Sequence, residues 1–258
     1  MAIDLHAQWF RDLAELRYAA TPKRLRAALA GRTVLDTCDA LLVWEPRRVV
    51  PYYAVPPGDL DLTLTEHPPV PVPPKVGPVL PPHHLDWHEI PGRSLHLEGH
   101  GEVGFRPDDP ALGGRVVMHW APFTWTEEEE PVVAHPHDPF KRIDVLPSSR
   151  KVRVEIGGVI IAESSRPMML IETGLPVRWY LPVDDVRMDQ LMPSDSRTVC
   201  AYKGTASYLS ADGAPDVAWY YPDPLHDVAP VRDLLSFWRA ATVYVDGEAV
   251  PTGMPGEP

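Results

Sequence analysis

The stretch RLRAALAGRTVLDTCDALLVWE, residues 24–45, decides the fold, because a second stretch of the chain matches it without a gap. The second stretch is KVRVEIGGVIIAESSRPMMLIE, residues 151–172, and each pair of matched positions is separated by 151 − 24 = 127 residues. Both stretches end an apolar run with a glutamate, Glu45 in the first and Glu172 in the second. Self-similarity over a long interval predicts two tandem copies of one domain.

The match also changes a local prediction. The segment LRAALAG, residues 25–31, has the alanine and leucine content of a helix. Its counterpart VRVEIGG, residues 152–158, alternates apolar and polar side chains and contains β-branched residues, which is typical of a strand. Since matched copies share a structure, we predict that both segments are strands ending in a glycine turn. Residues 4–17 keep apolar side chains at helical spacing and predict a short N-terminal helix.

Proline is the unusual feature of the composition, with 32 among 258 residues. Because proline breaks helix interiors, the chain is predicted to be mainly β and rich in turns. The densest run, EHPPVPVPPKVGPVLPPHH at residues 66–84, cannot form a sheet ladder and favours polyproline II. We interpret this run as a stiff surface insertion, and a ligand for an aromatic-lined groove is the alternative. The predicted domains are residues 1–146, with this insertion, and 147–250, followed by a tail at 251–258.

The charge and the cysteine content exclude several classes of protein. A net charge of −12 argues against binding to nucleic acid or to an anionic membrane surface, since both need a basic protein surface. The N-terminus is acidic where a signal peptide is basic, and no apolar run reaches the roughly 18 residues of a membrane span. The two cysteines, Cys38 and Cys200, form no disulfide framework. We therefore expect a cytoplasmic protein, a monomer or weak oligomer, without nucleic-acid or membrane partners.

Histidines concentrate in the first copy, where eight of the eleven lie between His83 and His137. Imidazole is a common ligand of zinc, copper and nickel, so a metal site assembled from several loops is one reading. The sequence has neither an HExxH motif nor a CxxC pair to support it. We therefore predict scattered surface or turn histidines, no metal and no cofactor. The acidic run at residues 127–130 is predicted to be a solvated turn.

The stretch TVCAYKGTASYLS, residues 198–210, contains the most reactive combination of side chains. A lysine ammonium lowers the pKa of a nearby thiol, but on a strand Cys200 and Lys203 would point to opposite faces. They can cooperate only if residues 202–204 form a turn or bulge, which Gly204 permits. A nucleophilic role and an anion-binding role for Lys203 both stay open. Glu172 ends an apolar run and needs a polar partner, for which Arg178 or a ligand is a candidate.

Three blocks in the second copy carry a family resemblance. They are ETGLPVRWYLPVDDV, SDSRTVCAYKGTASY and WYYPDP, which begin at residues 172, 194 and 219. With these blocks the second copy closely resembles the bacterial domain of unknown function 427 family. The first copy looks like the degenerate first domain of two-domain members. It keeps WEPRRVVPYYAVP, residues 44–56, and HPHDPFKRIDVLPSSR, residues 135–150, but lacks the YKG block.

The resemblance implies a β-tent-like fold, in which two small antiparallel sheets meet at an angle around a pocket. Other tent folds hold zinc with cysteine pairs, which this chain lacks, so we expect no structural zinc. The activity of the family is unassigned. The nucleotidyltransferase label sometimes attached to it has no support here, because the sequence has no GS motif with paired aspartates and no phosphate-binding glycine loop.

We predict a small-molecule site in the second copy, since aromatic walls with a few convergent polar groups are typical of ligand sites. The predicted residues are Glu172, Arg178, Tyr180, Cys200, Lys203, Tyr208 and Trp219. A planar ligand with an anionic or carbonyl group would suit Lys203 and Arg178, whereas an aromatic cage would suit a cation. Two alternatives stay open: an enzyme that uses Lys203 or Cys200, and a structural or protein-interaction domain without a ligand.

Overall fold

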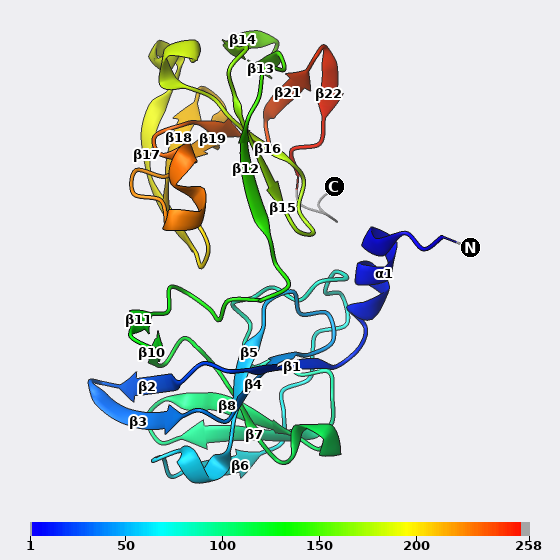
Figure 1. Ribbon diagram of the computed structural model, residues 1–258, viewed down its shortest axis with the longest axis vertical. Helices are drawn as coiled ribbons and strands as arrows, with labels where there is room; N and C mark the ends of the chain where they lie inside the picture. Colours follow the sequence, from blue (N-terminus) through cyan, green and yellow to red (C-terminus); the bar gives the residue numbers. More distant parts are fainter. Residues whose placement is uncertain (1, 254–258) are drawn as a thin grey trace. The chain divides into compact units, whose positions relative to one another are not determined.

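A computed structural model describes residues 2–253, apart from the side chains of residues 6, 9 and 10. The last five residues of the predicted tail, 254–258, lie outside the described part. Two compact units divide between Asp138 and Pro139, the first drawn in blue to green and the second in green to red (Figure 1). Strands dominate both units, which confirms the mainly β prediction.

Unit 1 consists of two antiparallel sheets. The larger sheet has the order β1-β4-β5-β9-β8-β7-β6, and the smaller has the order β11-β10-β2-β3. The strands of the larger sheet are β1 (Arg17–Thr21), β4 (Ala40–Trp44), β5 (Tyr52–Val55), β6 (Thr65–His67), β7 (Gly92–Leu97), β8 (Gly101–Pro107) and β9 (Val116–Met118). Those of the smaller sheet are β2 (Leu25–Leu29), β3 (Arg32–Thr37), β10 (Thr124–Glu127) and β11 (Glu130–Pro131). Helix α1 (Leu5–Asp12) and the 3-10 turns η1 (Pro57–Asp59) and η2 (Pro110–Leu112) complete the unit.

Unit 2 consists of three small antiparallel sheets. The first has the order β12-β15-β16, with strands Ile143–Pro147, Met168–Glu172 and Arg178–Tyr180. The second has the order β14-β13-β21-β22, with strands Val159–Ser164, Val152–Ile156, Ala241–Val245 and Glu248–Val250. The third has the order β17-β18-β19-β20, with strands Met192–Cys200, Gly204–Ala211, Ala214–Tyr220 and Ser236–Phe237. Three 3-10 segments lie between strands: η3 (Val183–Asp185), η4 (Met188–Gln190) and η5 (His226–Val231).

The structure confirms some of the secondary-structure predictions for single segments and corrects others. LRAALAG forms β2, because pairing with β3 and β10 outweighs its helical propensity, so the strand prediction is confirmed. The N-terminal helix is shorter than predicted and ends at Asp12, since the chain from Arg17 pairs with β4 instead. The proline-rich run forms a loop between β6 and β7, although its first residues, Glu66 and His67, join the edge strand β6. The solvated-turn prediction for the acidic run holds only for residues 128–129, which form the turn of the β10–β11 hairpin, whereas Glu127 ends β10 and pairs with Lys23.

The two units repeat the same local contacts. In unit 1 the Thr37 hydroxyl donates to Asp59 over 2.6 Å, and in unit 2 the Ser164 hydroxyl donates to Asp185 over 2.7 Å. Each hydroxyl ends the second strand of a hairpin, and each carboxylate lies in a 3-10 turn. Both hairpins, β2–β3 and β13–β14, contain a register shift at the same relative place.

Candidate functional site

A cavity of about 150 Å³ lies in unit 2, with side chains from the β15–β16 and β18–β19 strand pairs in its wall. Strand alternation explains which side chains reach it. Leu170 of β15, Tyr208 of β18 and Trp219 of β19 pack in one apolar cluster, whereas Leu209 and Ala218 point to the opposite core. The lining residues are Leu170, Glu172, Leu175, Arg178, Tyr180, Lys203, Tyr208, Trp219, Tyr221 and Trp238.

Six of the seven residues predicted for a ligand site line this one cavity. The seventh, Cys200, is half-buried at the end of β17 and is not among the described lining residues. Residues 201–203 form the turn that the cooperation of Cys200 with Lys203 requires, and Gly204 follows it with a φ of 89°. The turn places Lys203 on the cavity wall, whereas Cys200 is not among the described residues that line it.

The centre of the site is the Glu172 carboxylate, which is 5% exposed. Lys203 donates to one of its oxygens, and the Lys141 ammonium lies 3.0 Å from the other. Burial alone would raise the pKa of Glu172, but the two ammonium groups outweigh this effect and lower it below its usual value. Two positive charges on one carboxylate leave an excess positive charge beside the cavity.

The predicted ion pair between Glu172 and Arg178 is wrong. The β15–β16 register sets Arg178 opposite Leu170, while the turn before β18 brings Lys203 to the carboxylate. Arg178 instead donates to the Thr252 carbonyl over 2.6 Å. Its guanidinium also lies 5.5 Å from the centre of the Trp219 ring, which is within cation–π range.

An aromatic network forms the rest of the wall. The Trp219 indole donates to the Tyr180 hydroxyl over 3.1 Å, and the Trp238 ring meets Trp219 edge-on at 5.3 Å. The Tyr208 hydroxyl shares a 2.7 Å hydrogen bond with Thr198. Burial raises the pKa of Tyr180, so this phenol stays protonated at neutral pH. The network fixes the rings and leaves their faces for packing.

Sequence reasoning missed five side chains of this site: Lys141 beside Glu172, and Leu170, Leu175, Tyr221 and Trp238 in the cavity wall. Lys141 lies in the segment HPHDPFKR, far along the chain from the YKG block, and Trp238 follows the two-residue strand β20. Neither position lies in a periodic pattern long enough to show which way its side chain points. The apolar residues that flank Trp238 were the available signal, since a tryptophan between short strands is most often buried.

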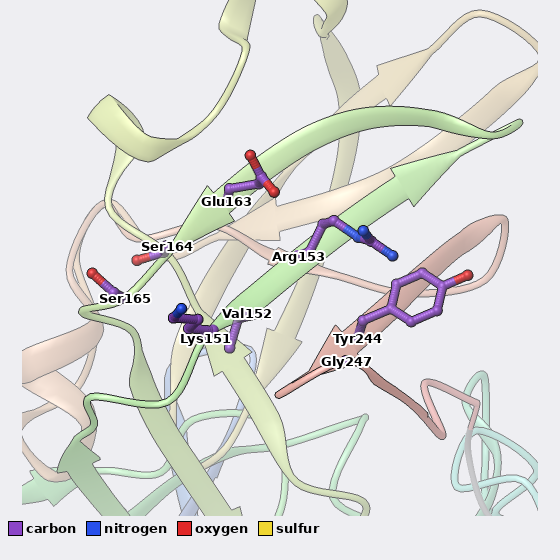
Figure 2. A pocket seen from close by; sticks show the side chains of 8 residues that line it. All are labelled: Lys151, Val152, Arg153, Glu163, Ser164, Ser165, Tyr244 and Gly247. Atoms are coloured by element: carbon purple, nitrogen blue, oxygen red, sulfur yellow. The ribbon is translucent and has the colours of Figure 1, made fainter.

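A larger hollow of about 380 Å³ lies against β13, β14 and β21 of the same unit (Figure 2). Figure 2 shows Arg153 beside Tyr244, and the guanidinium lies 4.6 Å from the ring centre. Lys151 and Glu163 on its rim are exposed to solvent. Because its charged groups remain hydrated, this hollow offers a ligand less electrostatic discrimination than the cavity at Glu172.

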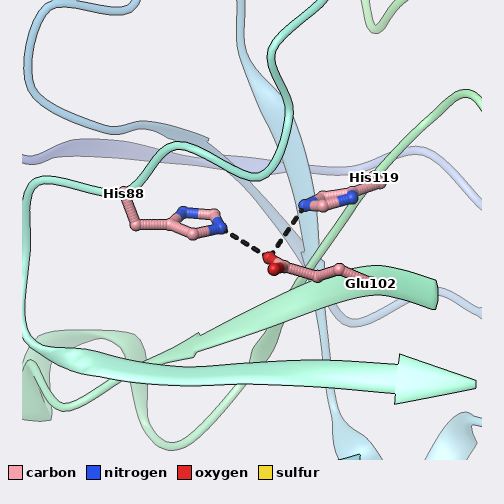
Figure 3. A group of neighbouring side chains, drawn as sticks. All are labelled: His88, Glu102 and His119. Carbon is pink, nitrogen blue, oxygen red and sulfur yellow. Dashed lines mark hydrogen bonds and ion pairs between the residues drawn. The ribbon is translucent and has the colours of Figure 1, made fainter. Parts of the chain in front are cut away.

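Unit 1 contains a buried polar cluster of His88, Glu102 and His119 (Figure 3). The prediction of surface or turn histidines is wrong for His88 and His119, which are 6% and 3% exposed. His88 lies between two carboxylates, 3.0 Å from Glu45 and 2.7 Å from Glu102. Burial alone would lower the pKa of His88, but these hydrogen bonds raise it to about 9. Sequence spacing does not reveal this cluster, since its members lie on separate segments.

Comparison with known proteins found a family match within unit 2. Residues 144–250 match the family described as "Domain of unknown function (DUF427)", which confirms the resemblance for the second unit. The matched range contains all seven residues predicted for the ligand site. A search of curated proteins found no match to this chain. Within the described residues, no helix has the length and apolar character needed to cross a membrane.

Proposed function

We propose that unit 2 binds a small planar molecule bearing an anionic or carbonyl group in the cavity at Glu172. The observation that carries the proposal is the convergence of Lys203 and Lys141 on one buried carboxylate, beside the aromatic wall. An anionic ligand would add a second negative group to this pair of lysines. The ring of Trp219, supported by Arg178, supplies a face for a planar body.

The cavity volume limits the size and affinity of the ligand. A volume of about 150 Å³ equals roughly five times the liquid volume of a water molecule, so the enclosed part of a ligand has about five to eight non-hydrogen atoms. The best small ligands gain about 1.5 kcal/mol per atom, so the tightest dissociation constant is a few micromolar for five enclosed atoms and about a nanomolar for eight. Small carboxylates and ring carbonyl compounds are therefore the class to test.

The experiment is a thermal-shift screen of small carboxylates and carbonyl compounds, with and without chelator, followed by calorimetry of the hits. A ligand at 100 times its dissociation constant should stabilise the wild type by about 2.7 kcal/mol. Lys203→Met should lose this stabilisation, whereas Lys151→Met, on the rim of the other hollow, should keep it. The proposal fails if a hit stabilises wild type and Lys203→Met equally, or if no compound of this class binds.

The contact between Lys203 and Glu172 favours binding over nucleophilic catalysis. Glu172 holds the Lys203 amine in a hydrogen bond, so attack on a carbonyl carbon would first require this contact to break. Trapping of Lys203 by borohydride in the presence of a carbonyl compound would reveal a Schiff base and support an enzyme instead. Fast alkylation of Cys200 by iodoacetamide at neutral pH would do the same for the thiol.

We further propose that the two units are tandem copies of one domain and that the protein works in the cytoplasm. The matching hydroxyl–carboxylate contacts and the matching register shifts support the first proposal. The free and exposed Cys38 supports the second, since reducing compartments keep such thiols unpaired.

A further inference from the structure

We propose that unit 1 binds a divalent transition-metal ion of the zinc type through His88, Glu102 and His119. The ligand atoms would be Nε2 of both histidines and a carboxylate oxygen of Glu102, with Glu45 orienting His88. Figure 3 shows a ring nitrogen of each histidine facing the Glu102 carboxylate. This site lies in a different unit from the cavity at Glu172 and does not depend on the function proposed for that cavity.

The spacing of the three ligand atoms suits such an ion. Glu102 Oε1 lies 2.7 Å from His88 Nε2 and 3.5 Å from His119 Nε2, and all ligand atoms lie within 4.8 Å of one another. A tetrahedral zinc ion holds nitrogen and oxygen at about 2.0 to 2.2 Å, which places neighbouring ligands roughly 3.4 Å apart. Side-chain shifts of about 1 Å would therefore complete the geometry.

His119 supplies the independent sign of a missing partner. Its ring is buried, and its Nε2 atom has no hydrogen-bond partner among the described residues, although it points at Glu102. A buried polar atom without a partner costs about 1 to 3 kcal/mol, so such atoms are rare unless a ligand or water completes them.

The surroundings of His88 match the usual second layer of a metal site. Its Nδ1 atom lies 3.0 Å from both oxygens of Glu45, and its ring stacks on Phe105 at 3.8 Å. A carboxylate on the far nitrogen of a ligating histidine fixes the ring and increases the basicity of the ligating nitrogen. The two ring nitrogens of His88 face different carboxylates, Nδ1 facing Glu45 and Nε2 facing Glu102, so a metal ion at Nε2 would replace only the contact with Glu102.

The proline-rich insertion has a defined role in this proposal. Arg48 is buried, and its guanidinium donates to three carbonyls of the loop before β7, those of Pro81, His84 and Trp87, over 2.5 to 3.0 Å. These contacts anchor the end of the insertion directly before His88. The loop between β6 and β7 thus supplies His88 four residues after the insertion, far in sequence from His119, which explains why no short metal motif exists in the sequence.

Three protein ligands leave a fourth position for water or a substrate, which is the arrangement of catalytic zinc sites rather than structural ones. Glu45 and Glu102 are two buried carboxylates, and a divalent cation beside Glu102 would compensate part of their negative charge. His96 borders the site, with Nε2 at 3.9 Å from Glu102, and is partly exposed. Entry from solvent would pass this residue.

The test uses the untagged full chain, stripped with a chelator and titrated with Zn²⁺ by calorimetry and with Co²⁺ by visible absorption. We expect one ion per chain and the intense visible bands of tetrahedral cobalt. His119→Gln and Glu102→Gln should weaken binding by at least about 100-fold, and Glu45→Gln by about 10- to 100-fold. His100→Gln, an exposed histidine of the same unit, is the matched control and should bind as the wild type does.

Circular dichroism and thermal melting of each stripped variant separate loss of a ligand from loss of the fold. If a variant unfolds, Co²⁺ spectra of His119→Cys replace it, since a thiolate ligand adds a charge-transfer band that only direct ligation produces. Absence of binding to the wild type would overturn the proposal and leave the cluster as a proton-bridged network. Equal binding by wild type and folded His119→Gln would overturn it as well.

Discussion

Replacing Glu172 by glutamine tests the reasoning about the cavity, because it removes one charge and almost no volume. The side chains of Glu172 and Lys203 are 5% and 12% exposed, so solvent screens their interaction little. In the variant the Lys203 and Lys141 ammonium groups remain close together without a carboxylate between them. Each loses an acceptor, and the two then repel each other.

The expected loss of stability follows from the burial of the pair. Removing one partner of a buried ion pair costs about 3 to 5 kcal/mol. Lys141 is 21% exposed and can turn toward water, so we expect the lower end, about 3 kcal/mol. For a unit of this size, 1 kcal/mol changes the melting temperature by about 4 °C, so the unit 2 transition should fall by about 12 °C.

The assay is calorimetric melting and urea unfolding between pH 3 and pH 8, with Glu163→Gln as the exposed control. The folded-state pKa of Glu172 is below its unfolded value of about 4.3, so its contribution is complete above that pH. As the pH falls through the folded pKa, wild type loses this contribution and approaches the variant. Adding Lys203→Met to Glu172→Gln should recover about 1 kcal/mol or more, since the unpaired buried charge disappears.

A loss below about 0.5 kcal/mol for Glu172→Gln at pH 7 would contradict the argument, because this is the ordinary range of surface substitutions. A loss that stays constant from pH 8 to pH 3 would also contradict it. In that case the carboxylate would act through shape or hydrogen bonding rather than through its charge.

Three further substitutions test other contacts by urea unfolding. Tyr180→Phe removes the acceptor of the Trp219 indole and should cost about 1 to 3 kcal/mol; no loss would mean that the indole finds another acceptor. Gly204→Ala should cost more than Gly213→Ala, by about 1 kcal/mol, because both have positive φ but only the first would bring its Cβ within 3.2 Å of a carbonyl oxygen. Equal losses would show that the left-handed backbone alone matters. Arg48→Met should cost about 3 kcal/mol in unit 1, and a wild-type stability would refute its role as an anchor of the insertion.

Much of the candidate site in unit 2 could be predicted because its residues lie in the three sequence blocks that resemble the family and combine aromatic with basic side chains. Tyr208 and Trp219 were predicted to face a pocket, and their strands β18 and β19 do set both on one face. The partner of Glu172 could not be predicted in this way. Arg178 is near in sequence, but strand register holds it opposite Leu170, while a turn carries Lys203 back to the carboxylate.

The sequence by itself determined the β class, the two hairpins matched at a distance of 127 residues and the faces of the longer strands. These properties follow from side-chain period and turn chemistry, which act over a few residues. Only the tertiary structure decided that Trp238 lines the cavity, that Lys141 pairs with Glu172, and that His88, Glu102 and His119 meet in the core of unit 1. Which side chains from distant segments lie together depends on which strands pair and on where the loops are anchored. Both are decided by the free energy of contacts between residues far apart in the chain.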